Sequence, residues 1–402
     1  MPPPSPSTRG KGGAFRVVVD LIFSRYSRPF DASTLGLPPL LRKELPVCLA
    51  RLARSLGPGP EKDDFERRLL TLFDQLARET QSHVFQRVRG SKAQQHGGNK
   101  PGQEADQQVA LEQAHMLGSL LPALAAALAR PSEGHATHQA QWERGGLGAG
   151  GRQRLFRNLW CYCVMFGFVG SWAGNATSWP PEWQGACRMI ASASPTILGG
   201  RGGGGVLLEN EMELSEIVSG TWASHTSKLR SAYAKALPAR YRDAALNERR
   251  VSVAQCVFGM AVLELERLRA QGSESESIEG GLSAVLDYSG GLGPGGWAAG
   301  MSSKPASGEH VGGMVDGHVA CIEGVISRVV DLFIENLAKS VGSVWRDKVL
   351  GSQVGLLLRS LLSHVPGRRS AAERALKLIL KRFPYIHWNF DCFSLAMEVY
   401  ER

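Results

Sequence analysis

Residues 155–198, LFRNLWCYCVMFGFVGSWAGNATSWPPEWQGACRMIASASPTIL, decide the fold of this chain. Over residues 155–168 the apolar side chains cover every side of a helix, which is typical of a helix buried all round. Pro180 and Pro181 then predict the start of a second helix, because proline suits the first helical turn and the residue before it avoids the α region. A helix, corner and helix this apolar needs similar units on both sides to bury its surface.

Composition sets broad limits on the class of protein. The chain has 402 residues, of which 43% are hydrophobic, enough for a sizeable core. Its formal charge of +9 permits contact with an anionic surface without identifying one, and we expect no nucleic-acid partner. Seven scattered cysteines without a C-x-x-C pair predict reduced thiols in a cytoplasmic protein. The longest uncharged stretch, residues 159–181, is interrupted by glycine and proline and is too short to predict a membrane span.

The other apolar patterns repeat with the spacing of helices rather than the alternation of strands. They cover residues 40–56, 65–88, 109–129, 207–220, 224–237, 241–269, 319–338, 354–365, 371–383 and 388–400. Only residues 15–26, which are rich in β-branched side chains, suit a strand by propensity. The sequence therefore predicts an all-α protein, an irregular α-solenoid of stacked antiparallel helix pairs of the HEAT or armadillo type with disordered Gly-rich inserts.

These patterns divide the chain into six parts. We expect a disordered leader (1–14), a helical segment (15–130), a linker (131–151), a solenoid segment with the Trp-rich corner (152–271), a low-complexity insert (272–317) and C-terminal solenoid helices (318–402). The leader is preferred to an organelle transit peptide because no amphipathic, arginine-spaced helix opens the chain.

The search for catalytic motifs is negative. The sequence contains no G-x-x-x-x-G-K-[ST], H-R-D, D-F-G, H-E-x-x-H or G-x-S-x-G, so no catalytic, cofactor-binding or metal-binding residue is assigned. Two literal G-x-G-x-x-G matches begin at Gly146 and Gly291, but neither follows a predicted strand as a dinucleotide site requires. A Ser-His-Asp set dispersed along the chain is the alternative that the sequence leaves open.

One predicted helix, over residues 369–383, separates its charges from its apolar side chains. Three cations gather on one side of it: Arg374, Lys377 and Lys381. Such a row is ordinarily the solvated face of a core helix. The functional alternative is a basic strip that contacts an anionic partner or membrane headgroups, and these three are the candidate site residues.

Several segments carry a family resemblance. The motif W-P-x-E-W occupies residues 179–183, and I-A-x-x-S-P begins at Ile190. The sequence E-L-S-E-I, the helix predicted over 319–338 and the sequence K-R-F-P-Y-I-H-W, which ends at Trp388, follow in order. These segments resemble the helical region that lies upstream of the catalytic domain in type III alpha phosphatidylinositol 4-kinases. The resemblance covers residues 155–400 in patches, whereas residues 1–150 add only general helical character.

The resemblance implies a non-catalytic, N-terminal α-solenoid region of a lipid kinase that makes phosphatidylinositol 4-phosphate. It implies helical scaffold subunits of a kinase complex as partners, an anionic membrane surface as a second contact, and a cytoplasmic location peripheral to the plasma membrane. No catalytic residue is carried over, and ATP and Mg²⁺ are implied only for a kinase domain whose motifs this chain does not contain. The alternatives are an unrelated HEAT-like adaptor and an autonomous enzyme with an unrecognised site.

Overall fold

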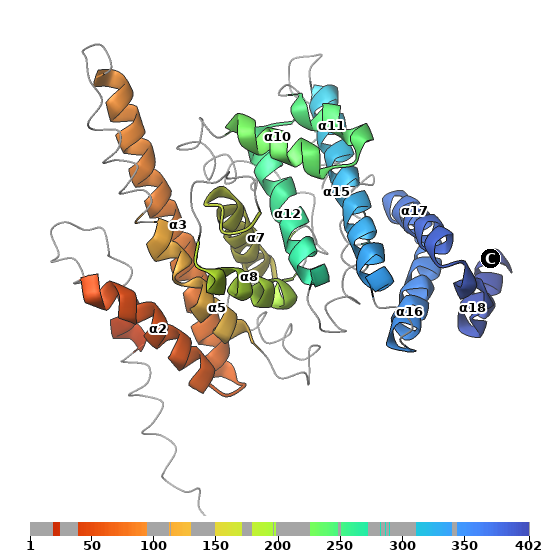
Figure 1. Ribbon diagram of the computed structural model, residues 1–402, viewed down its shortest axis with the longest axis horizontal. Helices are drawn as coiled ribbons and strands as arrows, with labels where there is room; N and C mark the ends of the chain where they lie inside the picture. The colour runs from red at the N-terminus through yellow and green to blue at the C-terminus, as the bar shows by residue number, and fades with distance from the viewer. Residues whose placement is uncertain are drawn as a thin grey trace, which may run out of the picture. The chain divides into compact units, whose positions relative to one another are not determined.

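The computed structural model describes the backbone of most of the chain (Figure 1). The described residues are 19–24, 39–94, 112, 114–129, 149–170, 179–195, 197, 226–247, 251–271, 282, 286, 289, 311–339 and 344–401. Twelve α-helices and one 3₁₀ helix are delimited within them, and none of these residues lies in a strand. The prediction of an all-α fold is confirmed. The chain divides into two compact units, Met1–Pro131 and Ser132–Arg402.

The first unit is built from three delimited helices. They are α2 (Pro39–Ser55), α3 (Pro60–Gln94) and α5 (Leu121–Leu128). Helix α5 packs against both α2 and α3. Its leucines and alanines meet Leu49 of α2 and Leu69 and Phe73 of α3 in a core that excludes solvent. Lys62 of α3 donates a hydrogen bond to the carbonyl oxygen of Ala129, where α5 ends. Apolar burial and a capping contact thus hold the three helices together.

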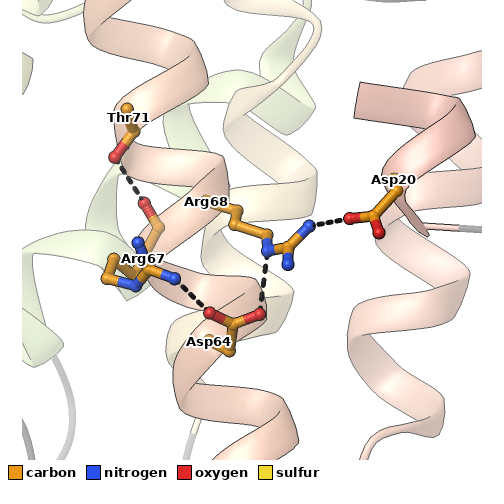
Figure 2. Close-up of polar contacts among 5 residues, drawn as sticks. All are labelled: Asp20, Asp64, Arg67, Arg68 and Thr71. Atoms are coloured by element: carbon orange, nitrogen blue, oxygen red, sulfur yellow. Dashed lines mark hydrogen bonds and ion pairs between the residues drawn. The ribbon is translucent and has the colours of Figure 1, made fainter. Parts of the chain in front are cut away.

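Residues 19–24 form a helical turn, so the strand suggested for this region is wrong there. Phe23 meets Phe65 of α3 edge to face, with 5.8 Å between ring centroids. Beside this contact Arg68 bridges two carboxylates, Asp64 one turn earlier on α3 and Asp20 on the short segment (Figure 2). The Arg68 Nε to Asp64 Oδ2 distance is 2.8 Å. The pKa of Arg68 is raised above its usual value, chiefly by the hydrogen bond to Asp20. Side-chain packing and charge therefore override the local β propensity.

The second unit contains the remaining helices. They are α7 (Ala149–Met165), α8 (Pro181–Ala193), α10 (Thr226–Ala236), α11 (Ala239–Leu246), α12 (Val253–Gln271), α15 (Val311–Lys339), α16 (Val344–Leu361), α17 (Pro366–Arg382), η1 (Pro384–Trp388) and α18 (Phe390–Glu401). Helix α12 packs against α7, α8, α10 and α15, and α16 packs against α17 and α18 (Figure 1). This side-by-side stacking of helix pairs is the solenoid arrangement that the sequence predicts.

The Trp-rich corner begins where α7 ends. Gly167 has φ +69°, and the amide of Phe168 donates to the carbonyl of Cys163, as in a Schellman motif. The turn places the Phe168 ring edge-on to Trp179 and Trp183, with centroid distances of 5.3 and 5.6 Å. The two indoles stack on each other at 5.3 Å. The aromatic residues therefore form a packed cluster that fixes the entry into α8.

The C-terminal end of α8 is held from two other helices. Trp160 of α7 donates its indole N–H to Ser194 Oγ at 3.0 Å. Arg269 of α12 donates to the carbonyl oxygens of Ser194 (2.7 Å) and Ala191 (3.3 Å) and pairs with Glu266 at 2.7 Å. Because all of these groups are buried, the serine of I-A-x-x-S-P has a structural role at this helix end.

The predicted helix over residues 241–269 is in fact two helices, α11 and α12. The break follows from a capping box: the Ser252 amide donates to Gln255 Oε1 at 2.8 Å, and the Gln255 amide donates to Ser252 Oγ at 3.2 Å. This reciprocal pair marks a new helix start. On α8, Ala186 and Ile190 are buried, whereas Met189 is exposed.

Two helices extend past the bounds that the sequence predicts. Helix α3 continues to Gln94, beyond the predicted end at residue 88, and α15 starts at Val311, inside the low-complexity insert expected over 272–317. The expected leader (1–14), the helix over 207–220 and most of the Gly-rich inserts lie outside the described residues.

All seven cysteines are free thiols, and Cys48 alone among them is exposed. Burial raises the pKa of Cys256 to about 11 and that of Cys321 to about 12. Both thiols line the junction of α12 and α15 with Tyr233, whose pKa burial also raises. The prediction of reduced core thiols is confirmed for the other six and is wrong for Cys48.

Candidate interaction surface

The predicted basic strip lies on α17. Pro366 occupies the first turn of this helix, and its alanines and Ile379 are buried toward α15 and α16. The helix carries six Lys and Arg residues against one acidic residue, Glu373. With its small apolar side buried, α17 presents most of its charge outward.

The structure places the three strip residues in different surroundings. Arg374 is half-buried, and its Nη2 lies 3.5 Å from Glu323 Oε1 of α15. Lys377 is exposed, and its Nζ lies 2.6 Å from Glu373 Oε1 one turn earlier. Lys381 is exposed at the end of the helix beside the exposed Arg382. Arg374 therefore links helices, whereas Lys377 and Lys381 form the solvent-facing part of the strip.

The ion pairs reduce the charge of the strip without removing it. Glu373 has a lowered pKa because it accepts a hydrogen bond from Lys377 and lies beside that charge. Because both partners are exposed, solvent screens their attraction, so Lys377 can exchange Glu373 for another anion at little cost. Lys381 and Arg382 add two cations at the C-terminal end, where the helix dipole favours positive charge.

The K-R-F-P-Y-I-H-W motif runs from α17 into η1, with its buried side chains in the middle and exposed side chains at both ends. Phe383 and Ile386 are buried, whereas Trp388 is exposed. Between them Tyr385 donates its hydroxyl proton to Asp347 Oδ1 of α16 at 2.7 Å. This hydrogen bond, followed by those from Arg346, lowers the pKa of Asp347. The motif thus ties η1 to the start of α16 and turns Trp388 toward solvent.

Beyond Trp388, α18 exposes a second surface that the sequence analysis did not identify. Phe390, Phe393, Met397 and Tyr400 are all exposed on this helix. The sequence carries a signal for this surface, because α18 has apolar residues on more than one side. In the structure only one of its residues, Cys392, is buried. Sequence periodicity cannot tell which apolar side faces the core, so this surface became visible only in the structure.

The described residues contain no group of three or more His, Cys, Asp or Glu side chains placed to hold a metal ion. None of the helices searched among them combines the length and the apolar character needed to cross a membrane. The G-x-G-x-x-G match at Gly146 runs into α7, which begins at Ala149, and the match at Gly291 lies outside the described residues.

Comparison with models of known protein families gives a match in the N-terminal half of the chain. Residues 40–177, roughly a third of the chain, match the family model for the PI4-kinase N-terminal region. The matched part includes α2, α3, α5 and α7 and ends just before the W-P-x-E-W motif. It overlaps the segments that carried the sequence resemblance only over residues 155–177, and most of it lies where only general helical character was noted. Residues 40–177 are therefore similar to the N-terminal region of PI4-kinases.

Proposed function

We propose that this chain is the non-catalytic solenoid part of a phosphatidylinositol 4-kinase of the type III alpha class. In this role it binds the partners of the enzyme and orients it during phosphatidylinositol 4-phosphate synthesis in phosphoinositide signalling. The observation that carries the proposal is the family match over residues 40–177 within a chain whose delimited elements are all helical. Stacked helix pairs provide long surfaces for binding other proteins.

The partners proposed are helical scaffold subunits of the kinase complex and an anionic membrane surface, without nucleic acid. The membrane contact is assigned to Lys377 and Lys381 of α17, because they are exposed cations on one side of a helix. It places the chain in the cytoplasm, peripheral to the plasma membrane. ATP and Mg²⁺ would bind the kinase domain of such an enzyme and have no role in this chain.

Co-purification tests the proposal directly. The full chain, carrying an affinity tag, is co-expressed with the helical scaffold subunits of a type III alpha kinase complex and analysed by size-exclusion chromatography. We expect the chain to elute together with the subunits. A HEAT-repeat protein of similar length and net charge, carrying the same tag, should elute separately. The purified chain is also incubated with ATP, Mg²⁺ and phosphatidylinositol vesicles, and we expect no phosphatidylinositol 4-phosphate above the blank.

Two results would contradict the proposal in different ways. Separate elution of chain and subunits would favour the unrelated HEAT-like adaptor. Lipid phosphorylation by the chain alone would show an autonomous enzyme and would overturn its non-catalytic role.

A further inference from the structure

Helix α18 presents a continuous row of large apolar side chains to solvent. The exposed fractions are 79% for Phe390, 57% for Phe393, 45% for Met397 and 87% for Tyr400. The spacing of three, four and three residues puts all four on one side of the helix. Trp388, which is 90% exposed, immediately precedes this row. We call these five residues the α18 face. Single exposed apolar residues are common, but a contiguous group marks an interaction site.

The opposite side of α18 is fixed to α16, so the exposure does not come from a detached helix. The Cys392 thiol donates to the carbonyl oxygen of Gly351 at 3.7 Å. A Cβ built on Gly355 would lie 3.7 Å from Leu395 Cδ2, in ordinary contact. Asn389 accepts a hydrogen bond from the Cys392 amide at 3.2 Å and caps the helix start. The α18 face therefore points away from α16 on a supported helix.

Acidic side chains border the α18 face along one side. Asp391, Glu398 and Glu401 are exposed, and α18 contains no Lys or Arg. Each of these acidic residues directly follows one residue of the apolar row, namely Phe390, Met397 or Tyr400. The acidic row and the apolar row therefore run side by side along the helix. The helix thus offers an apolar stripe with a negative border, although the chain as a whole is basic.

We infer that the α18 face binds an amphipathic helix of another protein, with an apolar stripe flanked by Lys or Arg. The apolar stripe would pack on the aromatic residues, and the cations would meet the acidic border. An anionic membrane is disfavoured here because three carboxylates would approach the headgroups. A second copy of α18 is disfavoured because two acidic borders would repel each other. The inference deepens the proposed function, rests on its binding role and leaves membrane contact to α17.

The test uses a fluorescein-labelled, stapled helical peptide of about 14 residues, slightly longer than α18. One version carries leucines at helical spacing with a lysine flank, and its matched control carries glutamates at the flank positions. Fluorescence anisotropy with the full chain should show binding of the lysine version only. The double variant Phe393→Ser/Tyr400→Ser should weaken it by about tenfold or more. Val344→Ser, which changes an exposed apolar residue on α16, should leave the affinity unchanged.

Charge reversal makes the assay specific. The double variant Asp391→Lys/Glu401→Lys should prefer the glutamate peptide over the lysine peptide. Circular dichroism is expected to be the same for all variants, because the replaced side chains are exposed. Equal binding of both peptides to the unmodified chain, or a lysine-peptide affinity that the Phe393 and Tyr400 replacements leave unchanged, would overturn the inference.

Two further measurements test the two other candidate partners of the α18 face, a membrane and a second copy of the chain. Flotation with phosphatidylserine vesicles that is lost in Phe393→Ser/Tyr400→Ser would assign the α18 face to a membrane. A concentration-dependent dimer that the same variant abolishes would assign it to a second copy. Either result overturns the inference and leaves the co-purification with scaffold subunits to be judged separately. Peptide binding without that co-purification would instead refute only the proposed kinase role.

Discussion

At the scale of single residues, Gly259 allows α10 and α12 to pack closely. Gly259 lies in the middle of α12, where glycine costs about 1 kcal/mol relative to alanine. A Cβ built on it would lie 2.2 Å from the hydroxyl oxygen of Tyr233 on α10. Tyr233 is completely buried, so its ring has no open space into which it could move. The glycine is therefore explained by packing rather than by backbone conformation.

Replacing this glycine should destabilise the protein. We expect Gly259→Ala to lower the free energy of unfolding by about 1–3 kcal/mol, because the added methyl group overpacks the α10–α12 contact. Gly185→Ala on α8 is the matched control, since its Cβ would meet nothing within 4 Å. It should stabilise the helix by up to about 1 kcal/mol. Urea unfolding followed by circular dichroism measures both, and an equal change in the two variants would refute the packing argument.

Burial of single residues could be predicted where it depends on the spacing of apolar residues within one helix. The role of a residue could not be predicted where it depends on contacts that are distant along the chain. The Leu155, Leu159 and Cys163 stripe is buried as predicted. The roles of Ser194 and Arg269 depend on contacts about 75 residues apart along the chain. No periodicity or motif spacing encodes such a contact, so it could be found only from coordinates.

At the scale of helices, Arg269 joins α12 to the end of α8. Its guanidinium is buried, pairs with the buried Glu266 and donates to the carbonyl groups of Ser194 and Ala191 at the end of α8, where the Ala191 carbonyl also accepts the Ser194 amide. Capping of one helix by a charged side chain of another couples their positions. The contact between α8 and α12 should therefore depend on this one residue.

Arg269→Met tests that dependence. We expect a loss of about 3–5 kcal/mol in the free energy of unfolding, because the change leaves a buried carboxylate and two carbonyl groups without the guanidinium. Lys377→Met is the control, since it removes an ion pair within a single helix, with Glu373 four residues earlier, on an exposed surface. Its cost should be much smaller than that of Arg269→Met, because solvent screens an exposed pair. Denaturant unfolding measures the free energy of unfolding of both variants. A similar decrease in both would show that burial of the Arg269–Glu266 pair does not increase its contribution to stability.

Helix existence was predictable from the sequence, but helix ends were less so. Periodicity located α2, α10 and α18 within two residues of their observed bounds, whereas α7 and α17 begin earlier than predicted. The break between α11 and α12 was missed because the apolar spacing continues across it, although Ser252 and Gln255 carry a capping-box signal. The start of α15 at Val311 lies among glycines, where propensity argues against a helix and packing decides.

At the scale of the whole molecule, the all-helical fold followed from the number and spacing of apolar patterns alone. The candidate site followed only in part. The sequence identified the cations of α17, but it could not show that Arg374 contacts Glu323 or that α18 exposes its aromatic side chains. Both facts depend on which side of each helix packs against α16 or α15, and a sequence with several apolar sides does not specify that choice.

The membrane contact proposed for α17 gives the last prediction. Lys377→Glu/Lys381→Glu should reduce flotation of the chain with vesicles that contain about 30% phosphatidylserine, because two exposed cations are replaced by anions. Arg374 is left in place since it links α17 to α15. Lys228→Glu/Lys235→Glu on α10 makes the same charge change at exposed positions elsewhere. Equal flotation of the two double variants would make the strip an ordinary solvated face.

The burial of six of the seven thiols limits how the protein reacts with oxidants. The thiolate is the nucleophile that attacks peroxides, and burial holds Cys256 and Cys321 in the protonated form at neutral pH. Cys48 is exposed on α2, in the other compact unit. We therefore expect mild oxidation to form sulfenic acid or a mixed disulfide at Cys48. The buried cysteines between the packed helices would remain unmodified.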